Sequence, residues 1–261
     1  MSLTLFLFFT FFAGACMGSL LTMMTYRLPR IIHGQESGSF TLNSPRSHCP
    51  NCRTTLCWYD NVPLISWLIL HGQCRYCAHP ISRSYPLTEL SCALLYLLLA
   101  TLLYPNLETL IAAYLLATFL LSLSLIDIKY LLLPDILTLS LLWLGIMLQL
   151  SGYLPHISLQ QSVIGVIAGY AMLWLPARLY YALRRKEALG MGDAKLLAAE
   201  GAWLGCQALP LLLLLASTGT IFWILLRSWR HGRSLNHPVP FGPALSATGF
   251  ILFLSVNIHW P

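Results

Sequence analysis

The stretch SLIDIKYLLLPD, residues 124–135, places two carboxylates beside a long apolar segment. No charged residue lies between Thr109 and Ile126, and apolar sequence resumes directly after Asp135. A run of roughly 20 apolar residues is what a helix needs to cross a bilayer. An ionisable side chain in such a helix raises the free energy of membrane insertion, and it is therefore a candidate functional residue. Asp127 and Asp135 are therefore candidate functional residues at the edge of a membrane.

The composition of the whole chain agrees with that interpretation. Of 261 residues, 57% are hydrophobic and only 9% are charged, whereas a soluble domain carries about 25% charged residues. The sequence therefore predicts an all-α polytopic membrane protein. We expect eight transmembrane helices, at 3–26, 87–104, 108–126, 136–151, 161–182, 194–209, 210–228 and 241–258, with a break between the sixth and seventh near Gly205–Pro210.

The net charge of +6 reports topology rather than a nucleic-acid partner. If the first helix runs from the outside of the membrane to the cytosol, every Lys and Arg lies on the cytosolic side or at that end of a helix. The loops on the opposite side, 105–107, 151–160 and 205–210, contain none. This is the positive-inside rule. It predicts a multi-pass membrane protein whose N-terminus lies outside the cytosol and whose long polar loops face the cytosol. The first positive charge, Arg27, follows the first apolar run, so we expect a retained helix and not a cleaved signal peptide.

The polar segment 29–85 separates the first helix, 1–28, from a membrane core at 86–261. It contains two Cys-x2-Cys pairs, Cys49/Cys52 and Cys74/Cys77, with 21 residues between them. Two such pairs supply the four thiolates of a tetrahedral zinc site, and a cytosolic loop favours metal binding over disulfides. Because all four positions are filled by protein, the predicted zinc is structural. Metal-free redox-labile thiols and an iron–sulfur cluster are the alternatives.

The other four cysteines (Cys16, Cys57, Cys92 and Cys206) read as ordinary small apolar residues. Nine acids occur in the chain, and four of them (Glu36, Asp60, Glu108 and Glu187) lie in loops, where we expect them to be solvated. Five acids lie in or beside apolar helices: Glu89, Asp127, Asp135, Asp193 and Glu200.

Asp135 and Asp127 have different expected roles. Asp135 follows Pro134 and starts a helix, where its carboxylate is expected to cap free backbone N–H groups. Asp127 ends a helix, where a negative charge opposes the macrodipole, so capping does not explain it. The structural alternative for Asp127 is an ion pair with Lys129 or Lys195.

A partner for Asp127 occurs in LGMGDAKLL, residues 189–197. Gly190 and Gly192 permit backbone conformations closed to other residues, directly before Asp193 and a helix, on the same predicted side as Asp127. Two neighbouring carboxylates at one depth repel each other when both are ionised, so the pair titrates as a unit. Such a pair suits peptide hydrolysis, in which one acid activates water and the other polarises the carbonyl.

With these motifs the chain resembles the type IV prepilin peptidases, a family of G-x-G-D membrane aspartyl proteases that also act as N-methyltransferases. Besides the cysteine pairs and the two aspartate motifs, the resemblance rests on GSLLTMMTYRLP (18–29), NVPLISWL (61–68), SRSYPLTEL (82–90), GMGDAKLLAAEGAWLG (190–205) and PVPFGP (238–243). It covers nearly the whole length.

The resemblance implies catalysis by Asp127 and Asp193, with Gly190, Gly192 and Lys195 in a supporting loop. The implied substrates are prepilins or pseudopilins, whose basic leader is removed after a glycine at the cytosolic face. The new N-terminal amine would then be methylated from S-adenosylmethionine. Gly72 and Glu89 are the candidate methyltransferase residues, and an ion pair with Arg83 is the structural alternative for Glu89.

The sequence departs from the family pattern at three positions. Thr22 stands where the family usually has asparagine, Ala194 replaces a frequent aromatic residue, and Glu200 interrupts a stretch that is usually apolar. A peptidase that has lost methyl transfer is therefore the alternative activity. Two other classes compete. A proton-coupled transporter would need acids deeper in several helices, and a non-enzymatic assembly factor would use the cysteine loop only for docking.

Overall fold

The computed structural model describes residues 2–34, 40–154, 156–186, 190–231 and 239–258. The predicted solvated acids Glu36 and Glu187 lie outside these residues. The chain divides into two compact units, Met1–Pro105 and Asn106–Pro261. The described residues form helices, turns and isolated bridges, and none of them belongs to a β-strand.

The first unit is built on the contact between α1 (Leu3–Ile32) and α3 (Ser84–Leu103). Gly14 and Gly18 make this contact close. A Cβ atom on Gly14 would lie 2.8 Å from the Cα atom of Ala93, and one on Gly18 would lie 2.6 Å from the Cα atom of Glu89. Small residues four apart are a common way to bring membrane helices together.

The polar loop between α1 and α3 contains two short helices, η1 (Trp58–Asn61) and α2 (Ile65–Ile69). The side chain of Arg27, near the end of α1, donates hydrogen bonds to the carbonyl oxygens of Thr41, Leu42 and Pro45. Arg27 is buried, and these bonds satisfy its guanidinium while they fix the start of the loop to α1.

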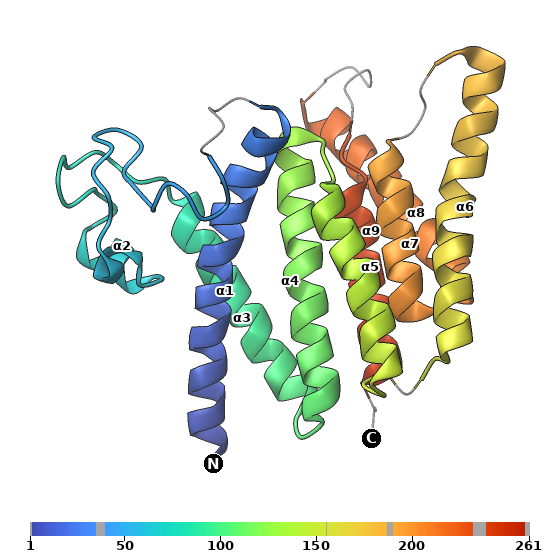
Figure 1. Ribbon diagram of the computed structural model, residues 1–261, viewed down its shortest axis with the longest axis horizontal. Helices are drawn as coiled ribbons and strands as arrows, with labels where there is room; N and C mark the ends of the chain where they lie inside the picture. Colours follow the sequence, from blue (N-terminus) through green and yellow to red (C-terminus); the bar gives the residue numbers. More distant parts are fainter. Residues whose placement is uncertain (1, 35–39, 155, 187–189, 232–238, 259–261) are drawn as a thin grey trace. The chain divides into compact units, whose positions relative to one another are not determined.

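The second unit contains α4 (Leu107–Tyr130), α5 (Asp135–Leu150), α6 (Leu159–Arg184), α7 (Met191–Leu204), α8 (Leu209–His231) and α9 (Gly242–Asn257). Helix α7 packs against α6 on one side and α5 on the other, while α4 packs against α9 (Figure 1). Glycines again set the spacing. A Cβ atom on Gly165 or Gly201 would overlap the other residue's carbonyl, and one on Gly169 would lie 2.6 Å from the carbonyl oxygen of Leu197.

The predicted helical membrane protein is confirmed, while the number of eight spans stays a prediction. Each of the eight predicted segments corresponds to a helix, and α7 and α8 are separated near Gly205, whose φ of +74° ends α7. Among the described residues, five helices are long and apolar enough to cross a membrane: α1, α3, α4, α6 and α8. α5 and α9 are apolar but have only 16 residues, and α7 has 14.

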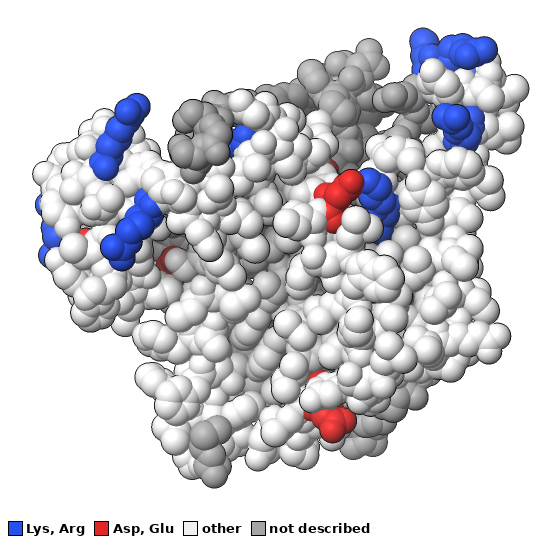
Figure 2. All heavy atoms as spheres, in the orientation of Figure 1, with Lys and Arg blue, Asp and Glu red and all other residues white. Residues whose placement is uncertain are grey.

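Charge is unevenly distributed over the second unit. On the face drawn in Figure 2, its Lys and Arg side chains lie toward the end at which α6 finishes and α7 begins. The acids proposed from the sequence, Asp127 and Asp193, lie near the last turn of α4 and in the first turn of α7.

Candidate active site

Asp127 is held by the start of α9. Its side chain is buried, with the residue 5% exposed, and its Oδ2 atom accepts a 2.9 Å hydrogen bond from the backbone N–H of Gly242. α4 continues beyond Asp127 to Tyr130, so the acid occupies the last turn rather than the end. The free N–H groups and positive dipole of the α9 N-terminus offset the unfavourable dipole of α4.

Gly242 is required for this approach. A Cβ atom at that position would lie 2.8 Å from Oδ2 of Asp127 and 3.1 Å from the side chain of Leu133. Real Cβ atoms essentially never lie within 3.0 Å of such an atom. The motif PVPFGP, noted in the sequence without a stated role, therefore supplies the backbone donor for Asp127.

Asp193 lies in the first turn of α7, where a negative charge is favourable. Its side chain is directed back over the glycine pair, because a Cβ atom on Gly190 would lie 3.5 Å from Oδ2 of Asp193. The backbone N–H of Asp193 donates to the carbonyl oxygen of Gly190 at 3.2 Å. The two glycines thus shape the approach to Asp193, although neither has positive φ.

Leu133 joins the two aspartate motifs. A Cβ atom on Gly192 would lie 2.8 Å from the Cβ atom of Leu133, and Leu133 also contacts Gly242. The starts of α7 and α9 therefore meet at one buried leucine, which belongs to the SLIDIKYLLLPD motif. Leu133 thus packs against Gly192, the neighbour of Asp193, and against Gly242, whose N–H binds Asp127.

The expected capping role of Asp135 is wrong. Asp135 is the first residue of α5 and makes no side-chain cap, since Pro134 occupies the N-cap position. Its carboxylate instead binds the ammonium group of Lys195, with Nζ 2.6 and 2.7 Å from the two oxygens. Lys195 therefore links α7 to α5, which excludes the alternative that it pairs with Asp127. With side chains 30% and 61% exposed, the ion pair is expected to be weak.

Glu200 is the most buried acid among the described residues, at 1% exposed. Neither oxygen of the Glu200 carboxylate has a hydrogen-bond partner among the described residues. The carboxylate faces α9, because a Cβ atom on Gly249 would lie 2.7 Å from Oε1. Glu200 lies seven residues after Asp193 on α7, so it is about 10 Å deeper along the helix at 1.5 Å per residue.

The four predicted metal ligands cluster as expected. The Sγ atoms of Cys49, Cys52, Cys74 and Cys77 all lie within 4.8 Å of one another. The two pairs have matching turns. Arg53 and Ala78, each four residues after the first cysteine of its pair, donate backbone bonds of 2.9 Å to that cysteine and have φ of +57° and +54°.

The donor set fits a zinc ion. Burial raises the pKa of the Cys49 thiol to about 11, while hydrogen bonding to Thr54 lowers that of Cys52 to about 6. Four adjacent thiolates repel one another, and a divalent cation bound between them offsets that repulsion. All four ligands belong to the chain, which is the arrangement of a structural site.

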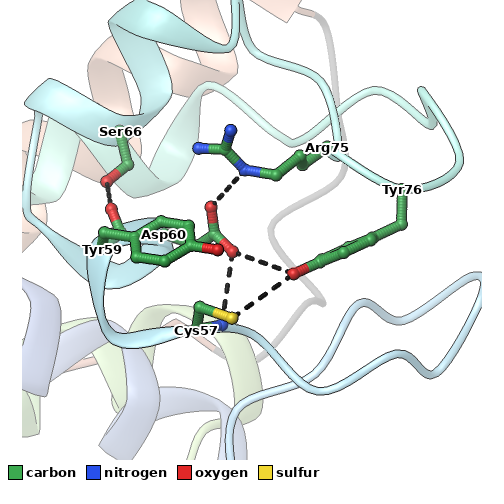
Figure 3. A network of polar contacts seen from close by, with 6 residues as sticks. All are labelled: Cys57, Tyr59, Asp60, Ser66, Arg75 and Tyr76. Carbon is green, nitrogen blue, oxygen red and sulfur yellow. Dashed lines mark hydrogen bonds and ion pairs between the residues drawn. The ribbon is translucent and has the colours of Figure 1, made fainter.

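Asp60 is not the solvated loop residue that the sequence suggested. Its side chain is 2% exposed, and Oδ1 accepts a 2.8 Å bond from Nε of Arg75 (Figure 3). Oδ2 accepts from the backbone N–H of Cys57 at 3.3 Å and from the hydroxyl of Tyr76 at 3.5 Å. Hydrogen bonding with Tyr59 and Tyr76 lowers the pKa of the Cys57 thiol. Cys57 is thus part of a polar network and is not merely a small apolar residue.

Glu89 binds a strained turn. It is 8% exposed, and Oε2 accepts a 2.8 Å hydrogen bond from the backbone N–H of Leu64. Leu64 has φ +62° and ψ −51°, and the N–H of Ile65 reaches the carbonyl oxygen of Pro63 at 2.6 Å. This is a γ-turn of the rare, strained hand, which costs about 1–3 kcal/mol and persists only where the surroundings fix it. The alternative pairing of Glu89 with Arg83 is absent from the ion pairs of the described residues.

Gly72, the other candidate for methyl transfer, has φ +70°. A Cβ atom there would lie 2.8 Å from Cζ2 of Trp67, so both conformation and space require glycine. The indole Nε1 of Trp67 is buried and has no hydrogen-bond partner among the described residues. Nothing in the sequence indicates a role for Trp67 or Leu64 beyond their place in NVPLISWL.

The helical fold and its acids define a class: a membrane protein built of helices, with carboxylates in the last turn of α4 and the first turn of α7. Comparison with known proteins identifies the family. Residues 12–103 match the Bacterial Peptidase A24 N-terminal domain, and residues 114–225 match the Type IV leader peptidase family. These two matches fall within the first and second compact units.

Relatives over most of the chain carry one name, prepilin leader peptidase/N-methyltransferase. The protein of Aeromonas hydrophila is 42% identical over 94% of this chain and 89% of its own length. That of Pectobacterium carotovorum subsp. carotovorum is 43% identical over 90% and 88%. That of Klebsiella pneumoniae is 44% identical over 80% and 90%. The chain therefore belongs to the type IV leader peptidase family and is an enzyme. No solved structure matches it.

Proposed function

We propose that this enzyme is an aspartic endopeptidase that removes the leader of type IV prepilins or pseudopilins, with Asp127 and Asp193 as the catalytic acids. The observation that supports the proposal is the position of Leu133, which lies against both Gly192, the neighbour of Asp193, and Gly242, whose N–H binds Asp127. The names of the relatives support the substrate class.

The chemistry follows from two acids that share one proton. Placed together in a poorly solvated site, they favour the state in which one is ionised and the other protonated. The ionised acid takes a proton from the attacking water, whose oxygen bonds to the carbonyl carbon, and the protonated acid gives its proton to the carbonyl oxygen, so that a neutral diol forms. The acid that took the proton from water then gives it to the amine nitrogen as the C–N bond breaks. The other acid recovers its proton from the diol as the carbonyl group forms again.

The cytosolic side of the bacterial inner membrane is the proposed place of cleavage, after a glycine that precedes the hydrophobic segment of the substrate. The N-terminus of the enzyme would then be periplasmic. On the face drawn in Figure 2, the Lys and Arg side chains of the second unit lie toward the end at which α7 begins. This distribution supports the proposed orientation, because loops rich in Lys and Arg stay in the cytosol. A basic leader on that side would meet both acids.

Methyl transfer to the new N-terminus is the second proposed activity. The residues of the first unit suit a polar methyl donor, S-adenosylmethionine, since they include the buried carboxylate of Glu89 and, beside Gly72, the indole N–H of Trp67, which has no partner among the described residues. Glu89 would hold an amine or hydroxyl group of the donor, and Gly72 would leave space beside Trp67. The relatives' names include this activity, and a peptidase without it remains the alternative.

Co-expression with a prepilin, followed by mass spectrometry of the mature N-terminus, tests both activities. We expect cleavage after the glycine and an added methyl group. Asp127→Asn and Asp193→Asn should each yield a folded enzyme that leaves the prepilin uncut. Glu108→Gln is the matched control, because Glu108 is an exposed acid at the other end of α4. Full processing by either aspartate variant would reject the proposed acid pair.

A further inference from the structure

The short helix α2 exposes its apolar side chains and buries its polar one. Ile65, Leu68 and Ile69 follow one another at helical spacing and are all exposed, up to 66% for Ile69, whereas Ser66 is buried. The hydroxyl of Ser66 donates a 2.7 Å hydrogen bond to the carbonyl oxygen of Tyr59 in η1. A helix on the surface of a water-soluble domain has the opposite pattern, with its apolar side chains packed inward. The exposed face of α2 therefore fits an apolar environment.

η1 adds a large aromatic side chain to this exposed apolar set. Trp58, its first residue, is 77% exposed. Trp58, Ile65, Leu68 and Ile69 thus lie uncovered within residues 58–69. Apolar side chains gathered on a surface in this way mark contacts with another protein or with a membrane. The depth of α2 along the membrane helices decides between these partners.

The ends of α1 and α3 set a depth scale for the first unit. The ring of Tyr104, the residue after α3, lies 5.5 Å from the ring of Phe6 near the start of α1. Positions 6 and 27 are 21 residues apart, so Arg27 lies about 31 Å from Phe6 along α1. The hydrocarbon layer of a bilayer is about 30 Å thick, and Tyr and Arg are typical residues of its two edges. One edge therefore lies near Tyr104 and the other near Arg27.

The start of α2 lies inside these limits. The N–H of Leu64, directly before α2, donates to Glu89 at 2.8 Å. Glu89 packs on Gly18, and Gly18 precedes Arg27 by nine positions, which is about 13 Å along α1. Along α3, Glu89 is 15 positions from Tyr104, or about 22 Å, which leaves it about 8 Å inside the nearer edge. In Figure 1, α2 is accordingly drawn beside α1, below the level at which α1 ends.

The neighbouring surface of α3 is exposed and apolar at the same depth. Leu87, Leu90, Leu94 and Leu98 recur every three or four residues and are all exposed, as in a helix that faces lipid. The exposed set of η1 and α2 continues this surface at the level of Leu87 and Leu90. The loop also carries exposed arginines that fit the anionic headgroups above that level: Arg46, Arg53, Arg75 and Arg83.

We propose that η1 and α2 form an interfacial segment inserted into the lipid leaflet at the Arg27 end of α1, with Trp58, Ile65, Leu68 and Ile69 in contact with acyl chains. The partner of this surface is the bilayer itself. The polar segment 29–85 is then only partly aqueous, and the Leu64 turn lies below the membrane surface. Lipid contact offsets the cost of exposing four large apolar side chains.

Photo-crosslinking in the full-length enzyme tests the insertion. The crosslinking residue p-benzoylphenylalanine is placed at Leu68, Leu94 or Arg46 in separate variants. Each is reconstituted in nanodiscs of phosphatidylethanolamine and phosphatidylglycerol with a prepilin present, and irradiated, and its adducts are identified by mass spectrometry. Leu94 is the control in lipid, since it is exposed within the apolar part of α3. Arg46 is the control in water, because it follows Pro45, whose carbonyl oxygen binds Arg27 at the membrane edge.

We expect lipid adducts at Leu68 and Leu94 in similar fractions, and at least about tenfold less at Arg46, which lies beyond the hydrocarbon layer. An adduct of Leu68 with the prepilin or with a second copy of the enzyme would make that protein the partner. A lack of adduct at Leu68, with lipid adducts at Leu94, would place α2 in water. Equal lipid adducts at Leu68 and Arg46 would remove the difference in depth. Each of these three results would overturn the proposal.

Trp58 provides a second measurement that needs no unnatural residue. The fluorescence lost in Trp58→Phe reports on this side chain alone, and Trp223→Phe serves as the reference for an exposed tryptophan of a membrane-spanning helix. We expect lipids brominated along the acyl chain to quench both contributions more strongly than acrylamide, which stays in water. Stronger quenching of the Trp58 contribution by acrylamide would reject the insertion. Both measurements are independent of cleavage and methyl transfer.

Discussion

The backbone N–H of Gly242 lies 2.9 Å from Oδ2 of Asp127, although the residues are separated by 115 positions in the sequence. One of the two acids thus depends on a helix start from the far end of the chain. The hydrogen bond stabilises the ionised form of Asp127. Among the hydrogen bonds of the described residues, no backbone N–H from another segment donates to the carboxylate of Asp193. We therefore infer that Asp127 is the member that accepts the proton from water.

Gly242→Ala tests this relationship. The added methyl group would overlap Oδ2 of Asp127 and press on Leu133, so the carboxylate must move. We expect kcat/KM for prepilin cleavage to fall by about 10²-fold, as for a catalytic group misplaced by about 1 Å. Gly219→Ala on α8 is the control, because its Cβ atom would meet nothing within 4 Å. Wild-type kcat/KM in Gly242→Ala would contradict the role of this contact.

The Asp135–Lys195 ion pair should contribute little to stability. Because both side chains are partly exposed, a double-mutant cycle of Asp135→Asn with Lys195→Gln is expected to give a coupling free energy below about 1 kcal/mol. The coupling should shrink further in 1 M salt, which screens exposed charges. Thermal unfolding in detergent provides the measurement. A folded Asp135→Asn enzyme without cleavage activity would instead place Asp135 among the catalytic groups.

Gly201→Ala should destabilise the second unit. The methyl group would overlap the backbone carbonyl of Gly165, and a main-chain atom cannot rotate away as a side chain can. Overpacking of this kind typically costs about 1–3 kcal/mol, which should appear as a lower thermal midpoint. Gly219→Ala again serves as the control, and it should be neutral or stabilising by up to about 1 kcal/mol because alanine favours the helix. Equal midpoints would show that α6 and α7 separate easily.

Glu200 is expected to lower stability. A buried carboxyl group without a hydrogen-bond partner costs about 1–3 kcal/mol, and methionine offers an apolar side chain of similar length. Glu200→Met should therefore raise the free energy of unfolding by that amount, whereas the exposed Glu108→Gln should change it by less than about 0.5 kcal/mol. A loss of stability in Glu200→Met would reveal a polar partner for the carboxyl group.

Removal of the metal should unfold the cysteine loop and leave the α1–α3 contact intact. The loop has little apolar core of its own, so metal ligation supplies much of its folding free energy, whereas α1 and α3 meet through Gly14 and Gly18. Limited proteolysis after chelation should cut within residues 40–82 and spare the helices. Cys57→Ser is the control, since Cys57 lies outside the four-sulfur cluster, and it should retain zinc and resist cleavage.

Much of the site could be read from local sequence, and the exceptions involve contacts between distant segments. Apolar runs predicted the helices, and spacing predicted the four cysteines, because both signals are local. The positions of Asp127 and Asp193 at helix ends were visible for the same reason. The Gly242 donor was not, since nothing in PVPFGP indicates which acid it meets.

Misassigned residues show the same limit. Asp135 looked like a helix cap because it follows Pro134, but Lys195 from another helix binds its carboxylate. Asp60 looked solvated because it lies in a polar loop, yet Arg75 covers it. In each case a partner far along the chain outweighed the local preference.

The close contact of α6 and α7 also restricts how a substrate can arrive. Where Gly165 meets Gly201, and Gly169 meets Leu197, the two backbones touch and no third helix fits between them. A hydrophobic segment arriving sideways from the lipid must therefore enter by another flank of the second unit. The residues on that other flank, and not those of the α6–α7 contact, would then determine which precursors the enzyme binds.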